Sequence, residues 1–182
     1  MKSIYNIFWV VLILQGCGKN EINQPLEYNG PQSEAEKVEL HYSEDQVVKV
    51  LLQADLVHEF QSGDREFPKG IYIEFFDEQG VLSSKLRANH AYYTSKENLW
   101  KATGKVEVVN IEKNEQLNTE ELFWQPAKQD IYTESFVTIR MQTEVIYGEG
   151  LEAKQDMSSY TIKKPQGEFA LKEAPASTGN PK

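Results

Sequence analysis

The sequence is poor in cysteine and in basic side chains, and it contains no long hydrophobic run. Its single cysteine, Cys17, excludes an intramolecular disulfide and a zinc site built from several cysteines. The chain has 19 basic and 28 acidic residues, and its formal net charge of −9 argues against binding to a nucleic acid backbone. The longest mostly apolar stretch, residues 4–14, reaches about half of a ~30 Å hydrocarbon core at ~1.5 Å of helical rise per residue, so we predict no transmembrane helix.

The start of the chain has the order of an export signal. Lys2 precedes the short apolar stretch, and Gly16 and Cys17 follow it. This arrangement resembles a bacterial lipoprotein signal, in which the cysteine is acylated and becomes the first residue of the mature chain, although Gln15 departs from the usual residue at its place. We therefore expect residues 1–16 to be a signal peptide and Cys17 to carry acyl chains such as palmitate. A free or buried cysteine is the alternative.

The two ends of the remaining chain differ in composition from its middle. Residues 17–37 are polar and contain Pro25, Gly30 and Pro31, which predicts a flexible lipidated tether. Residues 170–182 contain Pro175, Gly179 and no periodicity, which predicts a disordered tail. The folded domain is expected over residues 38–169.

Within that domain the hydrophobic period is two almost everywhere. Val106 and Val108 alternate with Lys105 and Glu107, and the same pattern recurs after residue 136. Such alternation predicts half-buried strands, and turn-like clusters at residues 77–80, 95–98 and 113–116 predict hairpins between them. Residues 45–58 fit neither a strict strand period nor a helical one, and we interpret them as a strand.

The strands form a repeat of about 31 residues. Leu86, Ala88 and Ala91 are matched by Leu117, Thr119 and Leu122, and a shortened third copy begins at Leu151. A unit of this length holds two strands, which cannot bury an apolar face alone and must stack on their neighbours. An ordinary β-sandwich with strands that are similar by chance is the alternative.

These segments also resemble a known family. LRANHAYY at residues 86–93, LNTEELFW at 117–124 and GEGLEA at 148–153 are similar to the LptC family, the periplasmic component of lipopolysaccharide export. The resemblance implies an all-β fold, a splayed, twisted β-jellyroll of the kind shared with LptA and OstA-like proteins. It also implies three partners: lipopolysaccharide, an inner-membrane ABC transporter and an LptA-like periplasmic bridge. The best-known members use a transmembrane helix, whereas this chain has the features of a lipoprotein, so we expect it at the periplasmic face of the inner membrane, with the outer membrane as the alternative.

The sequence offers no catalytic or metal-binding arrangement. His41, His58 and His90 are isolated from one another, and neither HExxH nor GxSxG occurs. Adjacent acids such as Glu120 and Glu121 point to opposite faces of a strand and cannot act as a pair. We expect a protein that is not an enzyme and needs no cofactor or metal.

The remaining chemistry is apolar binding. By default the inward residues of the strands are a hydrophobic core, but the family resemblance implies that they line a groove for lipid acyl chains. The candidate groove residues are Leu86, Ala88, Val106, Val108, Leu117, Thr119, Trp124, Ile131, Val137, Ile139, Met141, Val145, Leu151 and Ala153.

The ends of the sheet are the second candidate site. By resemblance, an N-terminal edge with Val47, Val48, Val50 and Leu52 would meet the transporter, and a C-terminal edge with Tyr160 and Ile162 would meet the bridge. Pro165 predicts that strand pairing ends near Lys164. Lys163 and Lys164 could instead keep this edge solvated and monomeric. The rival function is a structural or adhesive β-sandwich lipoprotein that binds no lipid.

Overall fold

The computed structural model describes residues 28–167, which are mostly in strands. The predicted all-β fold is confirmed, because eleven strands form one antiparallel sheet and the helices of this part of the chain are two short 3-10 turns. The elements are β1 (Ser33–Glu44), β2 (Val47–Glu59), β3 (Arg65–Phe67), β4 (Ile71–Phe76), β5 (Leu82–Ala88), β6 (His90–Thr94), η2 (Ser95–Glu97), β7 (Leu99–Asn110), β8 (Glu115–Gln125), η3 (Pro126–Lys128), β9 (Asp130–Arg140), β10 (Val145–Lys154) and β11 (Tyr160–Gln166). Cys17 and the predicted tail at 170–182 lie outside the described residues.

The sheet begins earlier than we predicted. β1 starts at Ser33, so the expected tether boundary at residue 37 is wrong. All of β1 except Val38 is exposed. A strand with water on both faces needs no alternation of apolar and polar side chains, so the pattern that identifies the other strands is absent here. The interpretation of residues 45–58 as strand is confirmed by β2.

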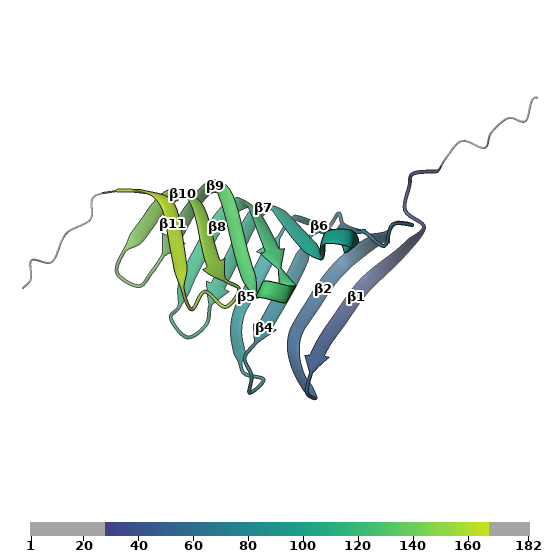
Figure 1. Cartoon of the computed structure of the whole chain (residues 1–182), viewed down its shortest axis with the longest axis horizontal. Coiled ribbons are helices and arrows are strands. Elements are labelled where there is room, and N and C mark those ends of the chain that lie inside the picture. The colour runs from purple at the N-terminus through teal and green to yellow at the C-terminus, as the bar shows by residue number, and fades with distance from the viewer. Residues whose placement is uncertain (1–27, 168–182) are drawn as a thin grey trace, which may run out of the picture.

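The sheet has a ring and an extension. Pairing runs in the order β11-β10-β9-β8-β7-β5-β4-β2, and β1 pairs with the far side of β2. The short strands β3 and β6 connect β2 back to β7, so β2, β4, β5, β7, β6 and β3 close into a ring. The later strands extend from it, and β1 and β11 are the two end strands, at opposite ends of the molecule (Figure 1).

The long strands pair in two halves. In β7, residues 99–103 pair with β6 and residues 107–110 pair with β5. Between the halves lie Gly104 and Lys105, with φ angles of 73° and 51°, and similar register shifts interrupt the β8–β9 and β9–β10 ladders. Because these irregularities bend the sheet, each long strand crosses from one sheet half to the other, and the inward faces of both halves enclose the core.

The 31-residue repeat is present in the backbone. Asn98 follows η2 and Gln129, 31 positions later, follows η3, and both residues adopt the left-handed conformation. β7 and β9 then follow these two turns. β8 is the continuous counterpart of β5 and β6, which are separated at Asn89. The predicted units of two strands are therefore the units of this fold.

Candidate functional site

The structure brings most of the predicted groove residues into one interior. Twelve of the fourteen are buried, all except Met141 and Val145. Their register explains this, because Leu86, Val108, Leu117 and Ile139 lie opposite one another across β5, β7, β8 and β9. Burial is a property of a hydrophobic core as well as of a lipid groove, so it is compatible with both interpretations.

The two other residues lie differently. Met141 follows the end of β9 and is half-buried against the core. Val145 is exposed, and its inclusion among the inward residues is wrong. In the part of β10 before its register shift, the inward positions are Ile146 and Gly148, so the side chain of Val145 lies on the outer face of the strand.

The interior is filled by its own side chains. A cavity of about 10 Å³ lies among Ile73, Leu86, Trp100, Leu122 and neighbouring residues. That volume holds at most about one water molecule, and it is far smaller than an acyl chain. The inward side chains of the two sheet halves are therefore packed against each other.

Aromatic rings close the margin of the two sheet halves that lies opposite the bend at Gly104 and Lys105. We call this margin, which contains Phe67, Phe75, Trp100 and Trp124, the mouth. The ring of Trp100 lies 5.2 Å from that of Phe67 and 5.7 Å from that of Trp124, and Trp124 meets Phe75 edge-on at 5.1 Å. Trp124 belongs to β8 and Phe75 to β4, on opposite sheet halves, so this contact bridges the mouth. Of these rings the sequence reasoning had identified only Trp124.

The turn between β10 and β11, residues 155–159, closes the mouth beside these rings. Ser84 Oγ donates a hydrogen bond to the carbonyl oxygen of Gln155 at 2.8 Å, and Asn110 Nδ2 donates one to that of Asp156 at 2.6 Å. The indole Nε1 of Trp124 donates to Gln155 Oε1 at 2.8 Å. Met157 is fully buried in the core cluster. We call this segment the β10–β11 turn.

The sequence reasoning missed Ser84, Asn110 and Met157. The sequence did contain a signal for the first two. Ser84 lies two positions before Leu86 and Asn110 lies two positions after Val108, so each continues the inward alternation of its strand. A polar residue at an inward position requires a hydrogen-bond partner, but the alternation does not say which segment supplies it.

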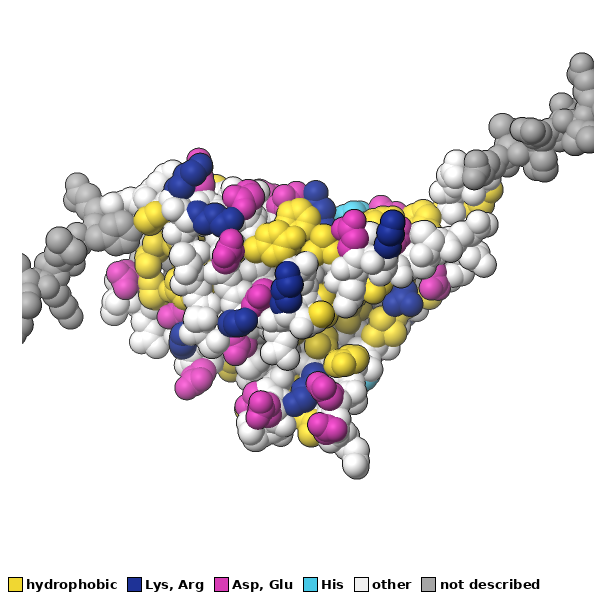
Figure 2. All heavy atoms as spheres, in the orientation of Figure 1, with side chains coloured by type: hydrophobic (Ala, Val, Ile, Leu, Met, Phe, Trp, Pro, Cys, Tyr) yellow, Lys and Arg dark blue, Asp and Glu magenta, His cyan; other side chains and the backbone are white. Residues whose placement is uncertain are grey.

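A second hollow of about 610 Å³ lies at the bend. Residues 54–57 of β2 pair with neither β4 nor β3, so the sheet opens there. Ala54 and Ala88 are among the apolar lining residues, and Lys69 and Arg87 are among the charged ones. Hydrophobic side chains are visible beside the β1–β2 hairpin, in the lower right of the molecule (Figure 2). The hollow separates part of this hairpin from the rest of the sheet.

The N-terminal edge is not the predicted one. β1 pairs with β2 along its whole length, so the edge assigned to Val47, Val48, Val50 and Leu52 is wrong. Leu52, for example, lies between Leu40 of β1 and Ile73 of β4. The exposed β1 therefore occupies the position expected for those residues.

The C-terminal edge is β11, and it contains Tyr160 and Ile162 as predicted. Pairing does not end at Lys164, because Pro165 lies opposite Gly148 and Gln166 opposite Tyr147. An end strand accommodates proline, since its unpaired side faces solvent. Lys163 forms ion pairs with Glu134 and Glu152, and Lys164 Nζ lies 3.3 Å from Glu149 Oε2.

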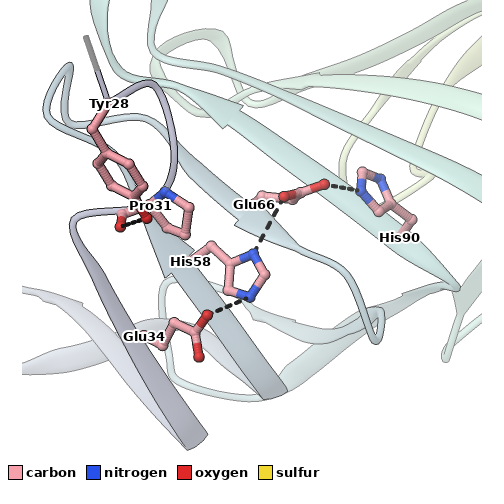
Figure 3. Close-up of polar contacts among 6 residues, drawn as sticks. All are labelled: Tyr28, Pro31, Glu34, His58, Glu66 and His90. Atoms are coloured by element: carbon pink, nitrogen blue, oxygen red, sulfur yellow. Dashed lines mark hydrogen bonds and ion pairs between the residues drawn. The ribbon is translucent and has the colours of Figure 1, made fainter. Parts of the chain in front are cut away.

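A polar cluster joins β2, β3 and β6. Glu66 accepts a hydrogen bond from His90 Nε2 at 3.0 Å, and its second oxygen lies 3.4 Å from His58 Nδ1 (Figure 3). These contacts, that with His90 above all, lower the pKa of Glu66 below its ordinary value of 4.5. Within residues 28–167, no grouping of three or more histidine, cysteine, aspartate or glutamate side chains is suited to hold a metal ion.

A comparison with protein families matches residues 4–165 to the family described as lipopolysaccharide-assembly, LptC-related. The match covers most of the chain. This chain belongs to the LptC family. A search of curated proteins found no match.

Membership of the LptC family implies a part in lipopolysaccharide transport. LptC is a transport component rather than an enzyme, and LptC proteins are associated with the periplasm and the inner membrane. None of the helices in residues 28–167 has the length and apolar character that a membrane span needs.

Proposed function

We propose that this LptC protein is a lipid-anchored periplasmic carrier that receives lipopolysaccharide from an inner-membrane ABC transporter and passes it to an LptA-like bridge protein. The observation that supports this proposal best is the continuous apolar interior, which extends from β2 to β10 between two end strands. A carrier in a relay needs both features, since lipid has to enter from one neighbour and leave to the next.

The interior suits acyl chains and not the phosphorylated head of the lipid. Its buried polar residues are Ser84, Asn110, Thr119 and Thr133, none of which carries a charge that could neutralise a phosphate. Burial of roughly a dozen methylenes contributes on the order of 10 kcal/mol before the ordering costs of binding. The protein has a net charge of −9, or −10 without residues 1–16, which contain Lys2 and no acid. The head group is therefore expected to project into solvent.

The two end strands are suited to β-augmentation, in which a partner adds a strand to the sheet. We assign β1 to the transporter and β11 to the bridge. β1 is attached to the sheet only through β2, and β11 only through β10. Partner strands at both ends would continue the apolar interior from protein to protein.

Site-specific crosslinking in cells tests lipid binding. A small aliphatic diazirine amino acid at Val108, Val137 or Ile139 preserves the volume of these buried side chains, and we expect it to capture lipopolysaccharide while the transporter is active. The same group at the exposed Arg140, beside Ile139, is the control and should capture less. If none of the three interior positions captures lipopolysaccharide, the carrier function is wrong.

The anchor is tested separately at Cys17. Replacement by alanine removes the thiol that accepts the lipid, so Cys17→Ala should leave an unacylated and uncleaved precursor. Metabolic labelling with a fatty-acid analogue measures this directly. Label retained by the variant would contradict lipidation at Cys17 and leave the carrier function standing.

A closed β-sandwich that binds no lipid is the second candidate, and the small volume of the interior cavity favours it. The same crosslinking experiment distinguishes the two functions. Purification with cell-wall or extracellular glycans, and without export subunits, would support the sandwich.

A further inference from the structure

The β10–β11 turn differs from the equivalent turns of the other two units. Its hydrogen-bonded part ends at Met157, which has a φ of 57° and donates its backbone N–H to Lys154 O. Asn98 and Gln129 make the same contact with the residue three positions earlier, so Met157 is the counterpart of the left-handed residues that follow η2 and η3. η2 and η3 contain no buried residue. Met157, in contrast, is completely buried. One unit of the repeat thus places its turn inside the mouth, where the other two leave theirs outside.

Three hydrogen-bond donors converge on this turn from three strands. Ser84 comes from β5, Asn110 from β7 and Trp124 from β8, and each donates to an oxygen atom of Gln155 or Asp156. Ser84 has an exposed fraction of 0% and Asn110 one of 5%, so the Ser84 hydroxyl and the Asn110 Nδ2 group depend on the turn for acceptors, while Asn110 Oδ1 accepts from Lys113 N at 2.6 Å.

The turn has the chemical character of a lipid. The acceptors for Ser84 and Asn110 are peptide carbonyl oxygens, and the ester and amide links that join acyl chains to a sugar also present carbonyl oxygens. Methionine has an unbranched, flexible side chain, which resembles a short segment of an acyl chain in shape. The turn therefore presents two carbonyl groups beside an unbranched apolar chain, which is also what the linkage end of an acylated glycolipid presents.

We propose that the β10–β11 turn occupies, in the empty protein, the binding site for the linkage end of an acyl chain. When lipid enters, Met157 leaves the interior, and Ser84, Asn110 and Trp124 donate to the ester or amide carbonyl oxygens of the lipid. This inference rests on the proposed function, because it names the residues with which that carrier would hold its cargo.

The position of the turn allows it to leave without unfolding of the ring. It follows β10 and precedes the end strand β11, so it lies outside the six strands that close on one another. Its other attachments are few: Gln155 N donates to Gln129 O at 2.9 Å, and Lys113 Nζ donates to Ser158 O at 2.7 Å.

The test uses the full-length protein in its own membrane, with the diazirine amino acid at Ile139 as the reporter. Met157→Ala shortens the apolar side chain and weakens the closed state, so we expect capture of lipopolysaccharide to rise about threefold, as the fraction of binding-competent protein increases. Ile111→Ala is the control, since it shortens an exposed apolar side chain that lies outside the turn and outside the interior, and it should leave capture unchanged. Equal capture by Met157→Ala and the unmodified protein would overturn the proposal and leave the carrier function intact. Absence of capture in every variant would overturn both.

The role of the donors is tested in the Met157→Ala background. Met157→Ala already weakens the closed state. Addition of Ser84→Ala and Asn110→Ala then removes the two donors, together with the acceptor that Asn110 Oδ1 provides for the backbone N–H of Lys113, and capture should fall to about a third. Unchanged capture would contradict the assignment of these donors.

Hydrogen exchange provides a measurement that needs no core substitution. The purified full-length protein is compared with and without purified lipopolysaccharide. We expect the amides of residues 155–159 to exchange faster when lipid is bound, while those of β7 to β9 exchange more slowly. Slower exchange in the turn on binding would show that it stays in place and would overturn the proposal.

Discussion

The two end strands of the sheet are built differently. β1 has twelve residues, of which eleven are exposed, and it pairs with β2 at eleven positions. β11 has seven residues, and cross-strand ion pairs connect its two lysines to glutamates of β9 and β10. β1 offers a partner a long strand, whereas β11 offers a short one whose charges are already paired and whose proline limits the backbone hydrogen bonds it can form.

The attachment of the two ends also differs. β2 holds β1 through a long ladder but is itself joined to the rest of the sheet by four pairs with β4 and two with β3. β10 pairs with β9 at nine positions on either side of one register shift. The β1–β2 hairpin is therefore the less firmly attached end, and β11 is the end more rigidly fixed to the core.

The largest effect on stability is expected from a charge placed in the apolar interior, because both end strands are attached to it. Ile139→Asp places an unpaired charge in the core, which costs several kcal/mol and most of the free energy of unfolding. Urea unfolding measures the loss, with Thr138→Asp on the outer face of β9 as the control. A stable Ile139→Asp protein would mean that the interior admits water, contrary to the closed mouth.

An intermediate effect is expected when proline is introduced into each end strand. Proline removes a backbone N–H from the strand. Ile162→Pro should lower co-purification with the bridge about tenfold and spare the transporter, and Leu40→Pro should do the reverse, because a lost ladder bond and the local distortion together cost of order 1–3 kcal/mol.

Ile162→Val and Leu40→Val retain the backbone N–H and serve as controls. If both proline variants fold and each loses the same partner, the assignment of the two edges to different partners is wrong.

The smallest effect is a dependence on pH at the joint of the β1–β2 hairpin. Glu66 lies in β3 and contacts His58 of β2 and His90 of β6, and its pKa is lowered in the folded protein. A carboxyl group with a lowered folded pKa stabilises the fold above its unfolded pKa, near 4.5, and this contribution is lost as the pH falls through the folded value. The contribution should be under about 1 kcal/mol, the range of partly exposed pairs.

Unfolding midpoints measured between about pH 3 and pH 6 should therefore depend less on pH in Glu66→Gln than in the unmodified protein. Glu36→Gln, in a side chain with no hydrogen-bond or ion-pair partner among residues 28–167, is the control. An identical pH profile for Glu66→Gln and the unmodified protein would show that the cluster does not contribute.

The sequence predicted the parts of the fold that alternate. β7 and β9 have one face in the core and one in water, so their period is two. Five of their inward residues were identified correctly, namely Val106, Val108, Ile131, Val137 and Ile139, whereas Ala102, Asn110 and Thr133 were missed. β1 has water on both faces and left no such signal. The mouth was not predictable from local pattern, because its contacts are distant in sequence: Ser84 meets Gln155 across 71 positions. Alternation tells which residues point inward, but not which segment meets them there.

The repeated unit also gives the molecule a modular length. Strands in a sheet are spaced about 4.8 Å apart, so each unit of two strands adds roughly 10 Å to the interior. Insertion of one whole unit of 31 residues between η3 and β9 would preserve the inward alternation and the turn geometry at Asn98 and Gln129, whereas insertion of a single strand would reverse the direction of every strand that follows. The interior of such a sheet can therefore lengthen only in steps of about 10 Å.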